Sequence, residues 1–441
     1  MSRQPRLKGL NFLARPTPEV QHMTDQVDNA GSRRQFLKFL AGSPVVALSG
    51  LSAFAGENAS SPTSLPDPVN WRALLTQDLI KNPAEAVNVF DFELVARKNV
   101  SPGHFGYMAS GIDDELTLRA NREAFTKLQL RPRRLNDVTK VETSIELFGV
   151  KWPTPIVIAP TGGNRAYHQD GDLAVARAAK ARGHLQILST VASTSIEDVI
   201  QARAAPIWFQ LYATQKWEVT QALVKRADAA GCPVLVLTVD RKAGRNQETY
   251  LRLRRTDSQD CSGCHEPGLK GLVRMKPNFD GIDLSGLTGL ESPNLTWDFV
   301  NRLKDATRMK VVLKGILTAE DAKLSVDNGV DGIIVSNHGG RAEDSGLSTI
   351  DCLPEVSKAV AGRIPVLVDS GFRRGTDVIK GLALGAQAIC IGRPYLWGLG
   401  AFGEPGVERV LEILHTELEV AMKQCGVRSI AELSPAFVRR V

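Results

Sequence analysis

Residues 332–341 have the sequence GIIVSNHGGR, and this stretch decides the fold. Three β-branched residues follow Gly332 without a polar interruption, which is typical of a parallel strand buried on both faces. His338 and Arg341 then lie in the loop at the carboxyl end of that strand, where a (β/α)₈ barrel places its active site. An imidazole can accept a proton near neutral pH, and a guanidinium group can bind a carboxylate through two hydrogen bonds. We therefore predict a proton-transfer site beside a carboxylate site, with Gly339 and Gly340 leaving room for a flat group.

A simpler interpretation is that His338 is an ordinary loop histidine and Arg341 a solvated surface charge. One pair of residues does not decide between the two interpretations. The rest of the chain has to supply the evidence.

Eight short apolar runs recur along the chain, at residues 155–160, 185–189, 207–211, 234–239, 310–314, 332–335, 366–368 and 388–391. Helical patterns fill the intervals, for example at residues 217–230, 319–328 and 376–384. Eight βα units with right-handed crossovers can close into one barrel. We therefore predict an α/β fold, a (β/α)₈ TIM barrel with an N-terminal helical cap and a long loop after strand 4.

The predicted domain spans residues 70–441, with the barrel proper at about residues 153–400. The cap occupies residues 70–150 and a closing helix residues 406–436. The long loop separates the fourth run from a helix near residues 294–307, and loops of that length are uncommon unless they have a function.

The composition excludes some classes of partner. The 441 residues are 43% hydrophobic, enough for a large core, and carry a net charge of +6. Residues 1–55 contain seven Lys or Arg and three Asp or Glu, so the remainder has a net charge of only +2. This balance argues against nucleic acid as a partner.

The N-terminal region resembles a twin-arginine export signal. Arg33 and Arg34 precede an apolar stretch, residues 39–54, that ends in a small-residue cleavage pattern at Ala55. A membrane-spanning helix is the weaker alternative, because the stretch is short and interrupted by glycine and proline. We expect a signal region at residues 1–55, with Met23 as a possible true start, a linker at residues 56–69 and a periplasmic location.

Polar residues or glycines follow every apolar run, which predicts one site shared around the rim of the barrel. These residues are Ala159, Pro160 and Thr161; Ser189; Gln210 and Tyr212; Thr238 and Asp240; Lys314; Ser336; Asp369, Gly371 and Arg373; and Gly392 and Arg393. Glycine-rich turns with Arg373 and Arg393 after the last two runs predict a phosphate site.

With these motifs the sequence resembles the FMN-dependent α-hydroxy-acid oxidase and dehydrogenase family, which includes glycolate oxidases, mandelate dehydrogenases and flavin-linked lactate dehydrogenases. The resemblance covers about residues 87–435 and rests on motifs in the family's order. They are Tyr107-Met108-Ala109-Ser110-Gly111, Gln210-Leu211-Tyr212, Thr238-Val239-Asp240, Leu313-Lys314-Gly315, Asn337-His338-Gly339-Gly340-Arg341 and residues 369–375. The resemblance implies FMN as cofactor, an L-2-hydroxy acid as substrate, its oxidation to a 2-oxo acid and a homotetramer.

The resemblance also implies roles for individual residues. His338 is the expected base and Asp240 orients it. Arg341, Tyr107 and Tyr212 bind and orient the substrate, and Lys314 lies at the edge of the flavin that gains negative charge. The other cofactor-binding residues are expected to be Ala159, Pro160, Thr161, Ser189, Gln210, Thr238, Ser336, Asp369, Gly371, Arg373, Gly392 and Arg393, and no metal site is predicted.

Three positions depart from the family's pattern. Gln247 stands where a second substrate arginine is expected, and Arg245 is the candidate to replace it. Val191 replaces a bulky aromatic residue found in many relatives, which predicts a differently shaped substrate pocket. Gly162 resembles the dehydrogenase members, so the sequence favours a quinone or cytochrome as electron acceptor over oxygen. Another FMN-barrel enzyme, such as an isomerase, and an inactive flavin-binding protein are the remaining alternatives.

The long loop carries the motif Cys261-Ser262-Gly263-Cys264-His265, which matches the attachment signature for haem c. A disulfide between Cys261 and Cys264 is the favoured interpretation, and haem c, a zinc site or free thiols are the alternatives. The loop is also basic, so peripheral contact with anionic lipid is an alternative to a solvated surface. Its basic residues are Arg252, Arg254, Arg255, Lys270, Arg274 and Lys276.

Overall fold

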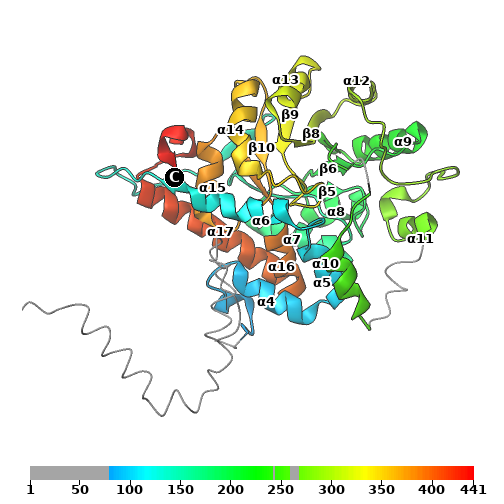
Figure 1. Ribbon diagram of the computed structural model, residues 1–441, viewed down its shortest axis with the longest axis horizontal. Helices are drawn as coiled ribbons and strands as arrows, with labels where there is room; N and C mark the ends of the chain where they lie inside the picture. The colour runs from blue at the N-terminus through cyan, green and yellow to red at the C-terminus, as the bar shows by residue number, and fades with distance from the viewer. Residues whose placement is uncertain (1–78, 242–243, 259–267) are drawn as a thin grey trace, which may run out of the picture. The chain divides into compact units, whose positions relative to one another are not determined.

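The computed structural model describes residues 79–241, 244–258 and 268–441 (Figure 1). Eight parallel strands form one sheet, in the order β4-β11-β10-β9-β8-β7-β6-β5. A bridge between Ile158 and Gln186 joins the two ends of this order, so the sheet is a nearly closed barrel. The predicted fold class is confirmed.

Seven of the eight predicted runs contain one strand of the barrel, and the strand of the fifth run, β8, extends two residues beyond it. The strands are β4 (Ile156–Ile158), β5 (Ile187–Ser189), β6 (Trp208–Leu211), β7 (Val234–Thr238), β8 (Lys310–Ile316), β9 (Gly332–Val335), β10 (Val366–Val368) and β11 (Ala388–Ile391). In β9, Ile334 packs inside the barrel, whereas Ile333 and Val335 pack in the outer core. This alternation buries both faces of the strand, which explains its unbroken apolar sequence.

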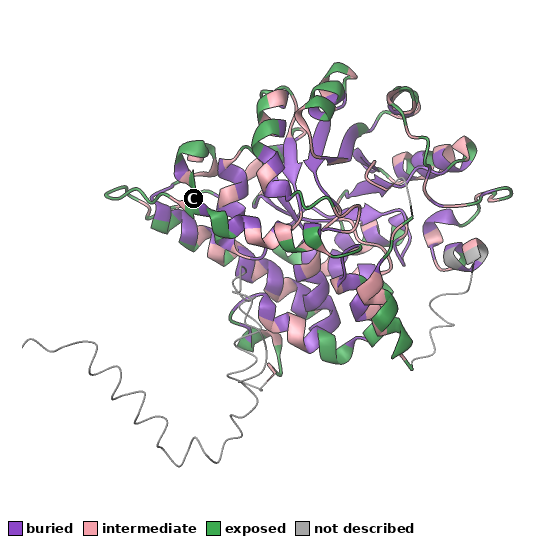
Figure 2. Ribbon diagram, viewed as in Figure 1, coloured by how far each residue is buried: buried purple, intermediate pink, exposed green. Residues whose placement is uncertain are grey.

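Helices surround the barrel and bury their inner sides against it (Figure 2). One helix follows each strand before the next begins: α7 (Gly171–Arg182), α8 (Ile196–Arg203), α9 (Trp217–Ala229), α12 (Trp297–Asp305), α13 (Ala319–Asp327), α14 (Thr349–Val360), α15 (Gly375–Ala383) and α16 (Arg393–Phe402). Short 3₁₀ turns, η4 (Asn164–Ala166) and η5 (Pro277–Phe279), lie in the connections.

The long loop after β7 contains two more helices, α10 (Glu248–Arg255) and α11 (Gly268–Arg274). Helix α10 lies beside α5 (Pro102–Ala109) of the N-terminal cap (Figure 1). A Cβ atom on Gly106 of α5 would lie 2.9 Å from Cδ1 of Leu253. The two helices therefore approach as closely as a glycine allows, and the loop supports the cap.

The sequence had predicted a helical cap, but the cap also contains short strands. Its helical elements are η2 (Pro83–Glu85), α4 (Phe90–Asn99), α5, α6 (Leu116–Glu123) and η3 (Ala124–Lys127). Strand β1 (Leu128–Leu130) pairs with the C-terminal β12 (Val438–Arg440), and β2 (Ile145–Leu147) forms a hairpin with β3 (Val150–Trp152). Leu147 of the hairpin belongs to the core inside the barrel, so the hairpin closes the end opposite the polar strand ends.

The closing helix is shorter than predicted. Helix α17 (Glu404–Cys425) ends at Gly426, whose φ of +71° is the left-handed conformation that commonly terminates helices. The 3₁₀ turns η6 (Ile430–Glu432) and η7 (Pro435–Phe437) follow it. Residues 427–436, which the prediction included in the closing helix, therefore lie beyond its end.

Several predictions lie outside the described residues. They are the twin-arginine signal, the linker and the Cys261-Cys264-His265 motif. In the described part of the chain, Cys232, Cys352, Cys390 and Cys425 are free and buried, and no group of side chains has the composition of a metal site. None of the described helices is long and apolar enough to cross a membrane.

Candidate active site

His338 and Asp240 form a partly buried pair at the polar end of the barrel. Asp240 follows β7, His338 follows β9, and His338 Nδ1 lies 2.8 Å from Asp240 Oδ1. The other ring nitrogen, Nε2, lies 3.3 Å from the Tyr212 hydroxyl. The Asp240 carboxylate can only accept a hydrogen bond, so Nδ1 carries the ring proton and donates it, and the Nε2 lone pair faces the tyrosine. This arrangement is that of a base held by an orienting carboxylate.

The surroundings keep the imidazole neutral. Burial lowers the pKa of His338 to about 4, and the cation of Lys314 adds to this effect against the opposing influence of Asp240. Burial works against the Asp240 carboxylate, but His338 and Lys314 together lower its pKa. A neutral base beside an ionised carboxylate is therefore the resting state at neutral pH.

The backbone places His338 through three hydrogen bonds and an unusual conformation. His338 has a φ of +59°, and its N–H donates to Ser336 Oγ over 3.1 Å. The next N–H, of Gly339, donates to Ser370 Oγ over 3.0 Å, and that of Gly340 to Asn337 Oδ1 over 3.0 Å. Side chains from the same rim thus hold the turn that aims the imidazole.

The sequence had suggested that the two glycines after His338 leave room for a flat group. In the structure, other protein atoms occupy the space beside both glycines. A Cβ on Gly340 would lie 2.6 Å from the backbone of Leu118 in α6, and one on Gly339 would lie 2.9 Å from Arg393 Nη1. Both residues also have positive φ, which favours glycine. Their role is to let the cap and Arg393 approach the loop.

Lys314 lies in the middle of a buried polar cluster. Its Nζ donates to Ser336 Oγ over 2.7 Å and lies 3.2 Å from Asp369 Oδ2 and 3.9 Å from Asp240 Oδ2. The two carboxylates outweigh burial and raise the lysine's pKa above its usual range. Lys314 is therefore a fixed cation at the centre of the rim.

A second chain of hydrogen bonds crosses the ends of β5, β6 and β7. Ser189 Oγ donates to Gln210 Oε1 over 3.0 Å, and Gln210 Nε2 donates to Thr238 Oγ1 over 3.0 Å. At the end of β4, Tyr395 donates to the Ala159 carbonyl over 3.1 Å and also contacts the hydroxyl of Thr161, which follows Pro160. These residues form a polar wall at the ends of β4, β5, β6 and β7.

Arg341, after β9, and Arg245, after β7, both contact Tyr107 of the cap. The Arg341 guanidinium carbon lies 4.4 Å from the Tyr107 ring centre, and its Nη1 donates to the Tyr107 carbonyl. Arg245 Nη1 lies 3.4 Å from the Arg341 carbonyl, and Arg245 also hydrogen bonds the Tyr107 side chain. The Tyr250 ring of α10 packs edge-on against Tyr107 at 5.7 Å. Two guanidinium groups and a phenol thus meet where a carboxylate can bind.

Tyr107 is 37% exposed; partial desolvation of its phenol would raise the pKa, but Arg341, Arg245 and Arg241 outweigh this effect and lower the pKa to about 8. Tyr107 therefore reports a strongly positive environment. Gln247 occupies the position where the resemblance to the family placed a second substrate arginine. It is buried, and its Nε2 has no hydrogen-bond partner among the described residues.

Arg241 is a site residue that the sequence did not reveal. It directly follows Asp240, its guanidinium carbon lies 4.9 Å from the centre of the Tyr212 ring, and it forms an ion pair with Glu291. A cation next to the orienting carboxylate was the available signal. The contacts of Arg241 with Tyr212 and Glu291 come from other parts of the chain, so only the structure identified it.

Arg373 and Arg393 lie at the ends of β10 and β11, as predicted. Arg373 stacks on Trp397 at 4.7 Å, and Arg393 donates to the carbonyl groups of Met108, Gly339 and Ser110 over 2.8–3.1 Å. Burial, together with the nearby cations Arg341 and Arg373, lowers the pKa of Arg393 to about 9. Buried cations that repel one another in this way fit a phosphate, which would relieve the repulsion.

Gly371 and Gly392 have different surroundings. A Cβ on Gly371 would overlap the backbone oxygen of Asn121 in α6. Contact with the cap alone therefore explains why this residue is a glycine. A Cβ on Gly392 would meet nothing within 4 Å. The open position at Gly392, at the start of α16, agrees with a bound group there.

The long loop returns to the site and fixes its floor. Asn278 donates to the carbonyls of Ser189 and Thr190, both over 3.2 Å, and accepts from the Ile196 N–H. Lys276 is buried close to Gly163. Burial raises the pKa of Asp172 to about 6, and the charge of Lys276 partly opposes this increase. Lys276 therefore cannot contact lipid, contrary to its inclusion among the lipid-contact residues.

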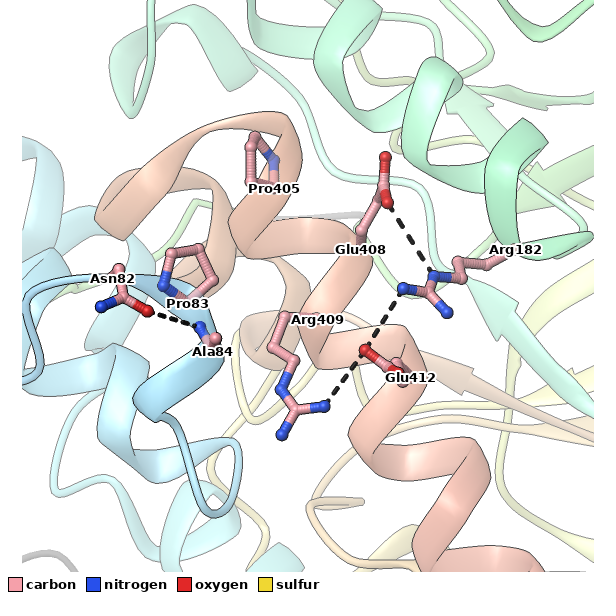
Figure 3. Close-up of a pocket in the computed structure, with 8 residues that line it drawn as sticks. All are labelled: Asn82, Pro83, Ala84, Arg182, Pro405, Glu408, Arg409 and Glu412. Carbon is pink, nitrogen blue, oxygen red and sulfur yellow. Dashed lines mark hydrogen bonds and ion pairs between the residues drawn. The ribbon is translucent and has the colours of Figure 1, made fainter.

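A separate hollow of about 380 Å³ lies away from the strand ends (Figure 3). Its charges neutralise one another: Arg182 lies 3.2 Å from Glu412, which lies 3.1 Å from Arg409. It is lined by Asn82, Pro83, Ala84, Arg182, Pro405, Glu408, Arg409 and Glu412. None of the predicted site residues lines it.

The model of the family described as FMN-dependent dehydrogenase matches residues 96–440. The chain therefore belongs to the FMN-dependent dehydrogenase family. The cations around Arg373 and Arg393, the open position at Gly392 and the polar wall of β5 to β7 fit the FMN that this family implies.

Curated relatives and solved structures support the same family. The chain is 42% identical over 353 residues to the L-lactate oxidase of Lysinibacillus sphaericus, covering 78% of this chain and 90% of that protein. It is 43% identical over 359 residues to the peroxisomal (S)-2-hydroxy-acid oxidase of Oryza sativa subsp. japonica, covering 80% and 95%.

Among solved structures, a soluble mutant of the membrane-associated (S)-mandelate dehydrogenase from Pseudomonas putida matches with a TM-score of 0.74 and 35% identity, over 80% of this chain and 99% of that one. A mandelate oxidase with (S)-2-phenylpropionate matches with a TM-score of 0.71 and 37% identity, over 81% and 98%.

Proposed function

We propose that the protein oxidises an (S)-2-hydroxy acid, the L form for common substrates, to the 2-oxo acid with FMN as cofactor. The observation that carries the proposal is the His338–Asp240 pair, whose Nε2 lies 3.3 Å from the Tyr212 hydroxyl, at the same barrel mouth where Arg341 and Arg245 meet at Tyr107. A base and a carboxylate site at one barrel mouth are what this oxidation requires.

The side chains divide the chemistry among themselves. Arg341, Arg245 and Tyr107 bind the substrate carboxylate, and Tyr212 orients its hydroxyl group. His338 Nε2 takes up a proton, and Asp240 stabilises the imidazolium that forms. FMN, when bound, supplies a two-electron acceptor.

The residues that would hold FMN surround this centre. Lys314 contributes a fixed positive charge where the cofactor gains negative charge. Ala159, Pro160, Thr161, Ser189, Gln210, Thr238, Ser336 and Asp369 would line the ring and ribityl chain, with Gly371, Arg373, Gly392 and Arg393 toward the phosphate. These assignments are tested by loss of FMN in single variants, with Arg373→Gln expected to release the cofactor.

Oxygen is the electron acceptor that the relatives favour, because the curated relatives named above are oxidases. The sequence alone had favoured a quinone or cytochrome, and Gly162 supports this second candidate because it resembles the dehydrogenase members. A membrane-associated dehydrogenase is also among the similar structures. The acceptor therefore requires a direct measurement.

The experiment is a substrate panel with two acceptors. Anaerobic L-lactate, glycolate and (S)-mandelate are added to the yellow protein, and loss of the visible flavin band identifies substrates. Air and then a soluble quinone analogue are compared as reoxidants. Failure of every 2-hydroxy acid to bleach the flavin would refute the proposed function, and faster reoxidation by the quinone would favour the dehydrogenase.

The pH profile of kcat/KM should be bell-shaped. Activity is lost as pH falls through the pKa of His338, near 4, because the protonated ring cannot accept a proton. Activity also falls as pH rises through the pKa of Tyr107, near 8, because a phenolate repels the substrate carboxylate. Steady-state rates of Tyr107→Phe should lack the alkaline limb. Tyr250→Phe is the matched control and should retain it, and an unchanged limb in Tyr107→Phe contradicts the assignment.

Gly162→Ala should destabilise the protein by about 1–3 kcal/mol, because the added Cβ would overlap Val191 Cγ2. Urea unfolding measures the change. The double variant Gly162→Ala, Val191→Ala removes the overlapping methyl group and should recover most of the loss. If the single variant is as stable as the unmodified protein, the packing argument fails. Oxygen reactivity should therefore be compared in the double variant.

We also propose, from the sequence, export by the twin-arginine route to the periplasm, a homotetramer and peripheral lipid contact. Fractionation of cells with and without the Arg33→Lys, Arg34→Lys change tests the first. Light scattering tests the second, and sedimentation with anionic vesicles tests the third.

A further inference from the structure

Three guanidinium groups surround the two tyrosines of the site. Arg341 and Arg245 both contact Tyr107, and Arg241 lies over the ring of Tyr212. One substrate carboxylate carries a single charge, and two arginines with a phenol are enough to bind it. The third arginine is therefore not needed for the carboxylate that every 2-hydroxy acid has.

Arg241 is positioned on the substrate side of the base. It stacks on and hydrogen bonds Tyr212, whose hydroxyl group lies 3.3 Å from His338 Nε2. Its side chain is 14% exposed, and its Nε has no hydrogen-bond partner in the described part of the chain. A partly open guanidinium group with an unused buried donor can accept a further anionic ligand.

Glu291 is the carboxylate that Arg241 binds in the structure. The neighbouring Ser292 N–H donates to the Ala213 carbonyl over 2.9 Å, which places Glu291 at the end of β6 beside the site. Burial raises the pKa of Glu291, although Arg241 and Arg245 oppose this. If Glu291 takes up a proton, its ion pair with Arg241 is lost, and a second substrate carboxylate can bind Arg241 in the presence of the neutral Glu291.

We propose that Arg241 is a specificity-determining residue that binds a second carboxylate on the side chain of the substrate, with Glu291 as its internal competitor. The preferred substrates are then 2-hydroxy dicarboxylic acids. This inference rests on the proposed oxidation of 2-hydroxy acids and adds the identity of the side chain.

The test compares substrates that differ only in the terminal group. (S)-Malate is paired with (S)-2-hydroxybutyrate, and (S)-2-hydroxyglutarate with (S)-2-hydroxyvalerate, in the FMN-loaded full chain. The readout is the ratio of kcat/KM within each pair. Binding of the corresponding 2-oxo acids, followed by the shift of the flavin spectrum, gives a second readout that needs no turnover.

We expect the dicarboxylate of at least one pair to be favoured about tenfold or more, a difference typical of one charge-assisted contact. Arg241→Gln should remove this preference. In the unmodified protein the dicarboxylate preference should decline with rising pH, because an ionised Glu291 competes for Arg241. Glu291→Gln, which mimics the protonated carboxyl group, should increase the preference and weaken this decline. The two variants therefore move the same ratio in opposite directions.

Two results would overturn the inference. One is bleaching by the monocarboxylates with no dicarboxylate preference in either pair. The other is an equal effect of Arg241→Gln on both members of a pair, which would show that Arg241 serves the common carboxylate. Neither result affects the proposed function, which fails only if no 2-hydroxy acid reduces the flavin.

Discussion

Replacement of His338 by alanine is expected to lower the rate of flavin reduction by about 10³–10⁴-fold while FMN stays bound. His338 Nε2 is the ring nitrogen left available by the 2.8 Å bond from Nδ1 to Asp240. The polar wall and the arginines that would hold FMN come from other strand ends. Stopped-flow bleaching by a 2-hydroxy acid measures the rate, and the visible spectrum measures the bound flavin.

His338→Asn is the matched control for the backbone. His338 has a φ of +59°, a conformation that asparagine tolerates better than alanine does. Both variants should lose the same activity if the imidazole is the base. Retention of activity in His338→Asn, or loss of FMN in both variants, would show that the residue acts through the loop conformation.

Replacement of Asp240 by asparagine should lower kcat by about 10²–10⁴-fold, because the base would be held in the wrong tautomer. An amide can donate to His338 Nδ1, which moves the ring proton to Nε2 and removes the lone pair that faces Tyr212. The carboxylate that stabilises the imidazolium is also lost. Single-turnover flavin reduction at saturating substrate separates this effect from binding.

Asp369→Asn is the control for the loss of a buried charge. Both carboxylates lie near Lys314 Nζ, Asp369 at 3.2 Å and Asp240 at 3.9 Å. Unlike those of Asp240, the described contacts of Asp369 do not include His338. Each variant leaves Lys314 with one carboxylate, so both proteins should fold. In the fraction that retains FMN, Asp369→Asn should lose much less rate. Equal losses would assign the effect of Asp240 to the charge of the cluster.

The sequence predicted the barrel well because strands buried on both faces have a local signature. The unbroken apolar runs that contain β9, β10 and β11 are bounded by polar, glycine or proline residues, and their predicted limits agree with the structure. The cap was predicted less well. The β2–β3 hairpin is too short for a clear pattern, and β1 pairs with a partner about 300 residues later.

Individual site residues show the same division. His338 and Asp240 follow apolar runs, so the fold class alone brings them to one rim. Arg241 could not be assigned, because its role depends on Glu291, about fifty residues later. Lys276 belonged to a basic loop in the sequence, but the fold buries it.

By itself, the sequence determined the eight-stranded barrel and placed the proposed base and the proposed carboxylate-binding residues at one rim, because periodicity and strand-end position are local properties. The tertiary structure alone decided that Gly339 and Gly340 admit Arg393 and α6, that Arg245 reaches Tyr107 and that Arg241 covers Tyr212. These facts depend on contacts between distant segments, and the direction of a side chain across such a contact is set by packing.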